Sequence, residues 1–433
     1  MLAYEFLKVA YGLLLLTLTK KKLSFGSHGR RMIRTTSSTF LRFLLFRCRV
    51  QYTSVPNDPL MHFDTLALRA THQPDPTTGS VVPPIHLSTT FARNEANELP
   101  ANYAYTRPNN PTRESLEKAL AVLEGGAVGM AFGSGQAAAM TLFQALRPGD
   151  HVLLSSDAYY GTPALLEQVF HPWGLTYTRV DMSDLDAVES SLHENTRIVW
   201  CETPSNPMLS ITDLLTISRL AHEAGAICVC DNTWATPVLQ RPIDFNVDVV
   251  MHSTTKYISG HSDVLGGALV FRQDNEFTQR VRLLQGVSGA VPSPFDCWLV
   301  SRGLKTLGVR VRAQSLTAQA IADFLVDHPA VEKVHYPGLA NHPDRALIQQ
   351  QMNGPGAMLS MQVKGDAADA IQFIGRLRLF TRATSLGGVE SLIEHRASVE
   401  GTSSTTPKNL LRLSIGLEHA DDLIADLAQA LNQ

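Results

Sequence analysis

The chain has 433 residues, more than one ordinary hydrophobic core accommodates, so we expect two or more domains. Apolar residues make up 44% of it and charged residues 18%, a composition that is typical of a folded enzyme and excludes a disordered or fibrous chain. A net charge of -3, and five cysteines without metal-ligand spacing, give no reason to expect nucleic acid, an anionic membrane or a metal as partner.

Residues 1–60 differ in composition from the rest of the chain. Basic residues, Ser and Thr are common there and acidic residues nearly absent, which is typical of an organelle transit peptide. The apolar run from Tyr11 to Leu18 alternatively indicates a signal peptide or anchor, although it is too short to span a bilayer. A third alternative is a non-native or dispensable extension, with Met61 as the true start. We leave this segment out of the fold and expect a cytoplasmic protein with reduced thiols, or a mitochondrial or plastid one if the transit peptide is genuine.

Residues 61–111 are expected to form an N-terminal arm that contacts a neighbouring subunit. The stretch 62–90 is rich in Pro and Thr and offers little to a core of its own. Pro and Asn dominate residues 103–112, which is typical of a turn.

Residues 112–300 are expected to form a large α/β domain. Leu116, Leu120 and Leu123 share one face of a helix predicted over 112–124. A predicted strand over 128–132 leads into a turn of small residues, 133–139, which opens a helix and offers free N–H groups to an anion. Strands and helices alternate as far as residue 256, which predicts a mostly parallel sheet.

Two apolar runs in this domain stop at residues that carry chemistry. The run 226–230 ends at Asp231, and the run 247–251 leads to Ser253, Thr255 and Lys256. Buried strands present such side chains at their carboxyl ends, where open α/β sheets bind ligands. The set suits pyridoxal phosphate, because Asp holds the pyridine nitrogen protonated, Lys bonds the cofactor and hydroxyls take phosphate oxygens. Taken singly, a lone Lys is usually a solvated surface charge and an Asp after a strand a turn residue.

Residues 301–433 are expected to form a smaller C-terminal α/β domain. A long helical pattern runs over 301–328, after which helices and strands alternate less regularly.

The order of residues through the ligand-binding stretch resembles the Cys/Met-metabolism family of pyridoxal-phosphate enzymes. The resemblance rests on the segments 231–233, 253–257 and 260–267 and covers the chain from about Phe63 to the C-terminus. The family includes cystathionine γ-synthases, γ-lyases and β-lyases and methionine γ-lyases. It implies fold type I, the aspartate-aminotransferase-like architecture, with a mostly parallel seven-stranded sheet in the large domain. It also implies a homotetramer built from dimers that share active sites.

Further motifs carry the family's cofactor-binding residues onto this chain. The segment 134–138 matches a phosphate loop, with Gln136 where the family has Met. Tyr160 matches the tyrosine that stacks on the cofactor ring, which we also count as catalytic with Lys256. A Tyr-x-Arg motif that reaches the phosphate of the adjacent subunit falls on Tyr105 and Arg107. The implied cofactor-binding residues are Lys256, Asp231, Ser253, Thr255, Gly135, Gln136, Tyr160, Tyr105, Arg107 and Asn206.

The resemblance also implies how an amino-acid substrate binds. Arg412 clamps its α-carboxylate, helped by Ser385 and Asn206. A structural salt bridge is the alternative interpretation of Arg412, since it alternates with apolar neighbours on a strand.

The reaction that we expect is γ-replacement or γ-elimination on an activated homoserine or cystathionine, as in cystathionine γ-synthases and γ-lyases. A cystathionine β-lyase or methionine γ-lyase is the alternative within the family, and an aminotransferase or a cofactor-free structural relative are alternatives outside it. The chain departs from the family patterns at Ala104, Thr384, Leu386 and the segment 395–401, all in regions that read the substrate.

Overall fold

The computed structural model describes residues 61–71, 74–400 and 406–432. The predictions for residues 1–60 lie outside this part. Within it, no helix is both long and apolar enough to cross a membrane, and the compartment stays a prediction. So do the domain boundaries at residues 112 and 301.

The larger sheet has seven strands in the order β1-β7-β6-β5-β4-β2-β3. Only β7 runs antiparallel to its neighbours β1 and β6, and the other pairs are parallel. The prediction of a mostly parallel seven-stranded sheet is therefore confirmed. Most strand residues are buried on both faces, as parallel sheets covered by helices require. The strands are β1 (Val128–Phe132), β2 (His151–Ser155), β3 (Thr176–Val180), β4 (Thr196–Glu202), β5 (Ile227–Asp231), β6 (Val249–His252) and β7 (Gly267–Phe271).

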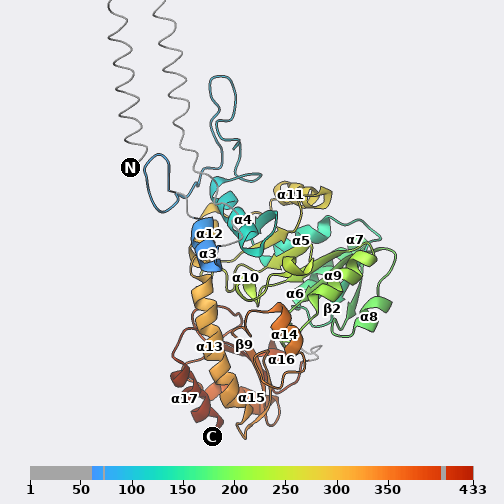
Figure 1. The fold of residues 1–433 in the computed structure, drawn as a ribbon, viewed down its shortest axis with the longest axis vertical. Coiled ribbons are helices and arrows are strands. Elements are labelled where there is room, and N and C mark those ends of the chain that lie inside the picture. The colour runs from blue at the N-terminus through green and yellow to red at the C-terminus, as the bar shows by residue number, and fades with distance from the viewer. Residues whose placement is uncertain (1–60, 72–73, 401–405, 433) are drawn as a thin grey trace, which may run out of the picture. The chain divides into compact units, whose positions relative to one another are not determined.

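Helices cover this sheet (Figure 1). The predicted helix over 112–124 is α4 (Pro111–Glu124), which begins where the Asn110 side chain accepts a hydrogen bond from Thr112 N. It ends at Gly125, whose φ of 78° lies in the left-handed region that glycine adopts easily. The others are α5 (Gly135–Gln144), α6 (Gly161–Leu165), the π-helical turn η2 (Leu166–Phe170), α7 (His171–Trp173), α8 (Leu185–Ser190), α9 (Leu214–Glu223), α10 (Thr236–Leu239), the 3₁₀ turn η3 (Pro242–Phe245), α11 (Glu276–Ser288) and α12 (Pro294–Leu304).

The second sheet has five strands in the order β10-β11-β12-β9-β8, antiparallel except for the β10–β11 pair. A smaller second sheet near the C-terminus agrees with the predicted α/β architecture. Its strands are β8 (Val331–His335), β9 (Met358–Val363), β10 (Thr381–Arg382), β11 (Leu392–His395) and β12 (Leu410–Ser414). Around it lie α13 (Leu307–Val326), α14 (Arg345–Gln351), α15 (Ala367–Arg376), α16 (Arg396–Glu400) and α17 (Ala420–Leu431).

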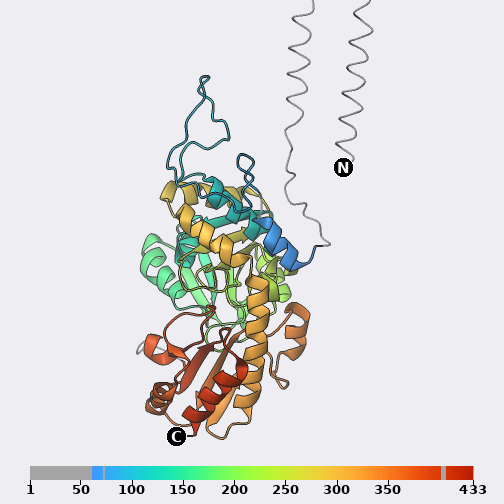
Figure 2. The same cartoon turned by 90° about the vertical axis from the view of Figure 1, so that its left-hand side faces the viewer.

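The long helical pattern over 301–328 is divided between two helices, α12 and α13, with a break at residues 305–306. Just before the break, Gly303 approaches Ser259 so closely that an added Cβ would lie 2.1 Å from the Ser259 carbonyl oxygen. Arg310 spans the break, donating from Nη2 to Gly303 O at 2.8 Å and from Nη1 to Tyr257 O at 2.8 Å. One turn later in α13, Gln314 Nε2 donates to Gly388 O and Ile415 O, at 2.6 and 3.0 Å. Figure 2 shows α13, in orange, running along the second sheet.

Helix α3 (Phe63–Ala70) packs against α4 and α13, and residues 74–110 form no helix or named strand. A single antiparallel bridge joins Thr90 to Tyr105, and the loop between them projects from the body in both views (Figures 1 and 2). The expectation that these residues contact a neighbouring subunit stays a prediction.

Candidate active site

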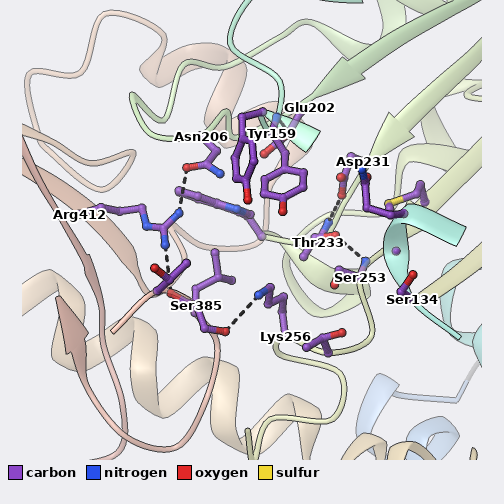
Figure 3. Close-up of a pocket in the computed structure, with 18 of the residues that line it drawn as sticks. Ser134, Tyr159, Glu202, Asn206, Asp231, Thr233, Ser253, Lys256, Ser385 and Arg412 are labelled. Atoms are coloured by element: carbon purple, nitrogen blue, oxygen red, sulfur yellow. Dashed lines mark hydrogen bonds between the residues drawn. The ribbon is translucent and has the colours of Figure 1, made fainter. Parts of the chain in front are cut away.

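Ten of the twelve predicted site residues line one cavity at the carboxyl ends of β4, β5 and β6 (Figure 3). Both sheets contribute to its walls, so residues far apart in the sequence meet there. The ten are Gly135, Gln136, Tyr160, Asn206, Asp231, Ser253, Thr255, Lys256, Ser385 and Arg412.

Lys256 follows β6, and its side chain points toward Ser385 in the C-terminal part of the chain. Its Nζ donates a hydrogen bond of 3.0 Å to Ser385 Oγ, and the two side chains face each other in Figure 3. Burial lowers the pKa of the Lys256 amine, and the positive charge of Arg412 lowers it further. The amine is therefore unprotonated at a lower pH than an ordinary lysine.

Asp231 ends β5 and is only 7% exposed. Its Oδ1 accepts a hydrogen bond from Thr233 N at 3.0 Å, while Thr233 Oγ1 accepts one from Ser253 N at 2.8 Å. Burial raises the pKa of the Asp231 carboxyl above its usual range. A carboxylate held in this way favours a cationic partner, such as a protonated ring nitrogen, because the partner's charge offsets the cost of burial.

The first turn of α5 has the features of a phosphate site. Ser134 caps the helix by accepting from Ala137 N, and Gly135 and Gln136 are its first two residues. An added Cβ at Gly135 would lie 3.0 Å from Met251 Cε and 3.2 Å from Ser253 Cβ, so glycine is what allows α5 to approach the Ser253 loop. Thr255, whose hydroxyl was predicted to bind a phosphate oxygen, lines the cavity. That hydroxyl already bonds both the N–H and the C=O of Gly266, at 3.0 and 3.1 Å.

The groups that line this cavity fit pyridoxal phosphate. The amine of Lys256, the carboxylate of Asp231 and the amide groups at the start of α5 line the same cavity, and they match the aldehyde, ring nitrogen and phosphate of the cofactor.

Arg412, on β12, is 4% exposed. Its Nη1 donates to Asn206 Oδ1 at 3.0 Å and its Nη2 to Ser385 O at 3.1 Å. Nη2 also lies 2.8 Å from Glu394 Oε1, so the salt bridge considered as the alternative is present alongside the cavity-lining position. Burial lowers the pKa of Arg412 to about 10, which leaves the guanidinium charged at neutral pH.

Two neighbouring tyrosines follow β2. Tyr160, predicted to stack on the cofactor, is 49% exposed, and its ring centroid lies 4.7 Å from that of Tyr159. Tyr159 also lines the cavity, and its N–H donates to Glu202 Oε2 at 2.7 Å. Burial raises the pKa of Tyr159 to about 12. The stacking role of Tyr160 stays a prediction.

Sequence reasoning missed several residues of the cavity and its surroundings. Glu202 ends β4 beside Asp231, and burial followed by the charge of Asp231 raises the pKa of its carboxyl well above the usual range. Its place at a strand end is a signal that was available. Glu394 lies opposite Arg412 in the β11–β12 register, a pairing that the sequence alone does not reveal. Trp234 was missed as well, and Arg396 lies in the segment 395–401, which was singled out only as a departure from the family pattern.

Tyr105 and Arg107 are the two predicted residues that the structure does not bring to the cavity. Tyr105 is 47% exposed, and Arg107 Nη1 donates to Gly286 O at 2.6 Å. Both were predicted to act in the adjacent subunit, and this role stays a prediction.

A lysine and a carboxylate at neighbouring strand ends of an α/β sheet, with a phosphate-binding helix start beside them, define a pyridoxal-phosphate-dependent enzyme. The family model described as Cys/Met metabolism PLP-dependent enzyme matches residues 64–432. The chain belongs to this family.

Named relatives and solved structures agree with this assignment. The chain is 48% identical over 373 residues to a cystathionine gamma-synthase of Mycobacterium tuberculosis, covering 85% of this chain and 96% of that protein. It is 41% identical over 386 residues to a cystathionine beta-lyase of Coxiella burnetii, covering 87% and 99%. The crystal structure of metB from Corynebacterium glutamicum has a TM-score of 0.84 at 45% identity, covering 86% of this chain and 98% of that one. Cystathionine gamma synthase from Xanthomonas oryzae pv. oryzae, in complex with aminoacrylate and cysteine, has a TM-score of 0.83 at 43% identity, covering 86% and 98%.

Proposed function

We propose that this enzyme catalyses γ-replacement or γ-elimination on an activated homoserine or on cystathionine. The observation that carries the proposal is that the Lys256 amine and the Arg412 guanidinium both bond Ser385, through Oγ and the carbonyl oxygen respectively. An amino acid with its carboxylate on Arg412 then has its α-carbon beside Lys256.

Pyridoxal phosphate, when bound, draws electrons from the substrate's α-carbon and makes its proton acidic. Lys256 is proposed to take that proton, which its lowered pKa favours. In the γ-reactions the same amine also moves a proton at the β-carbon. Arg412 holds the α-carboxylate with Asn206 and Ser385, and Asp231 keeps the ring nitrogen protonated. Tyr160 is proposed to cover the face of the ring.

Among these reactions, γ-replacement is supported by the degree of similarity to named relatives. Four relatives named cystathionine gamma-synthase are 47–48% identical to this chain, compared with 42% for one named cystathionine gamma-lyase and 41–44% for three named cystathionine beta-lyase. A β-lyase reaction is the second candidate, favoured by the latter relatives.

Steady-state assays of the holoenzyme with three substrates test the proposal. These are O-succinyl-L-homoserine with cysteine, L-cystathionine and L-methionine. We expect cystathionine from the first or 2-oxobutyrate from the second. Pyruvate alone from cystathionine would establish β-elimination instead, and amino transfer to an oxoacid without C–S cleavage would establish an aminotransferase.

We also propose that Tyr105 and Arg107 complete the phosphate site of an adjacent subunit, in a homotetramer that is built from dimers. Analytical ultracentrifugation should then show that the protein sediments with the mass of a tetramer. Arg107→Ala should weaken cofactor binding while Arg93→Ala, an exposed arginine in the same region, leaves it unchanged.

A further inference from the structure

Arg396 is a buried arginine at the beginning of α16, directly after β11. Its side chain is among the largest fully buried ones, at 1% exposure, and it lines the same cavity as Lys256 and Arg412. An arginine is rarely buried to this degree unless its charge is compensated.

Two carboxylates partly engage the Arg396 guanidinium. Nη1 lies 2.8 Å from Glu394 Oε1, the oxygen that also lies 2.8 Å from Arg412 Nη2. Nε lies 2.9 Å from Glu400 Oε1. Within residues 61–71, 74–400 and 406–432 no hydrogen bond engages Nη2. Since a guanidinium carries five N–H donors in a planar fork, Arg396 keeps donors available to a ligand in the cavity.

The position of Arg396 relative to its neighbours shows which part of a substrate it would meet. It shares Glu394 with Arg412, and its Cζ lies 5.6 Å from the centroid of the Tyr160 ring. The charge of Arg396 also contributes to lowering the pKa of Lys256, after burial and Arg412. With the α-carboxylate on Arg412 and the α-carbon at Lys256, Arg396 is left for the substrate's side chain.

Glu394 and Glu400, which pair with Arg396, are not among the residues that line the cavity. The charged cavity-lining residues are three bases, Lys256, Arg396 and Arg412, and two acids, Glu202 and Asp231. Burial raises the pKa of both acids and lowers that of Lys256, so the two arginines are the side chains of the lining that keep their charge most firmly.

We propose that Arg396 binds a carboxylate at the distal end of the substrate's side chain, which makes it a specificity-determining residue. The enzyme then prefers an amino acid whose side chain ends in a carboxylate over one of equal length that ends in a methyl group. This inference rests on the proposed function for the placement of the α-carboxylate at Arg412 and of the α-carbon at Lys256.

Binding of two matched, unreactive ligands tests the inference. L-2-aminosuberate and L-2-aminooctanoate have the same chain length and differ in a terminal carboxylate against a methyl group, and neither has a leaving group. Isothermal titration calorimetry on the holoenzyme should give a wild-type ratio of dissociation constants that favours the dicarboxylate. In Arg396→Gln the ratio should fall about ten- to hundredfold, the range of one charge-assisted hydrogen-bonded pair. Arg382→Gln, an exposed arginine outside the cavity, should keep the wild-type ratio.

An equal loss of affinity for both ligands in Arg396→Gln overturns the inference, because Arg396 would then only hold Glu394 and Arg412 in place. Glu400→Gln provides a second test that keeps the guanidinium. With one carboxylate fewer competing for it, the dicarboxylate should bind several-fold more tightly and the methyl-ended ligand unchanged. If Arg396→Gln does not fold, an unchanged ratio in Glu400→Gln counts against the inference.

The outcome is separate from that of the proposed function, because neither ligand needs to react. Selective binding that depends on Arg396 in an enzyme that forms neither cystathionine from O-succinyl-L-homoserine and cysteine nor 2-oxobutyrate from L-cystathionine would overturn the proposed reaction and leave this inference standing. Turnover of these substrates, together with equal binding of the two ligands, would support the proposed reaction and overturn this inference.

Discussion

The Nζ atom of Lys256 lies 3.0 Å from the Oγ atom of Ser385, a contact between residues 129 positions apart in the chain. It joins the loop after β6 of the larger sheet to the loop before β11 of the smaller one. The cavity therefore depends on both sheets, and changes on either side should alter its chemistry.

Replacing Lys256 by Ala should abolish turnover while the protein stays folded. In the proposed function this side chain supplies both the covalent attachment of the cofactor and the base, and loss of such a group costs about a thousandfold or more in rate. Visible absorbance of the lysine-bound cofactor should vanish, with an unchanged far-ultraviolet circular dichroism spectrum. A variant that kept even a tenth of the wild-type rate would contradict the proposal that Lys256 attaches the cofactor and acts as the base.

Glu394→Gln should shift the pH dependence of kcat to lower pH, because kcat reports the enzyme–substrate complex, in which the Lys256 amine is free. Burial, Arg412 and Arg396 lower the pKa of Lys256, whereas the charge of Glu394 raises it. Removing that charge lowers the pKa further, so the amine loses its proton earlier as pH rises and the acid limb moves down. Glu390→Gln, at an acid outside the cavity, is the matched control. A shift of the limb to higher pH would contradict this account.

Glu202→Gln should stabilise the protein, by an amount that grows with pH. Burial raises the pKa of Glu202 in the folded state, so the folded protein holds a proton that the unfolded chain releases above the usual value of 4.5. The wild type therefore loses stability as pH rises from there toward the folded-state pKa, and Gln, which cannot ionise, does not. The difference in Tm between variant and wild type should be larger at about pH 8 than at about pH 5. A difference independent of pH would show that Glu202 is ionised in the folded protein.

Gly135→Ala should weaken cofactor binding without unfolding the chain. The added methyl group would lie 3.0–3.2 Å from Met251 and Ser253, which forces α5 away from the Ser253 loop. We expect the dissociation constant for pyridoxal phosphate, measured by titrating the apoenzyme, to rise about tenfold, the effect of losing roughly one hydrogen bond. At Gly133 the nearest atom to an added Cβ is 3.8 Å away, so Gly133→Ala is a matched control that should bind normally.

The sequence predicts the residues at strand ends well, because their signal is local. Asp231 and Lys256 each follow an apolar run, and the ends of neighbouring parallel strands meet at one edge of the sheet. Gly135 and Gln136 are predictable in the same way, from a small-residue turn that opens a helix.

Residues that act through pairing between distant strands are harder to predict. Glu394 faces Arg412 only because β11 and β12 pair antiparallel in one register, which periodicity does not specify. The close approach of Gly303 to Ser259, next to the break between α12 and α13, joins residues far apart in the sequence, which periodicity does not reveal. Tyr105 and Arg107 were predicted to act in another subunit, where a single chain provides no partner.

Helix α13 holds both loops that meet in the cavity. Arg310 bonds the carbonyl oxygen of Tyr257, next to Lys256, and Gln314 bonds that of Gly388, close to Ser385. Four residues of α-helix separate these two anchors by about 6 Å. The spacing between the loop that carries Lys256 and the loop that carries Ser385 is thus set by one rigid helical turn, so changing the distance between these two cavity-lining residues would require a change in α13, outside the cavity itself.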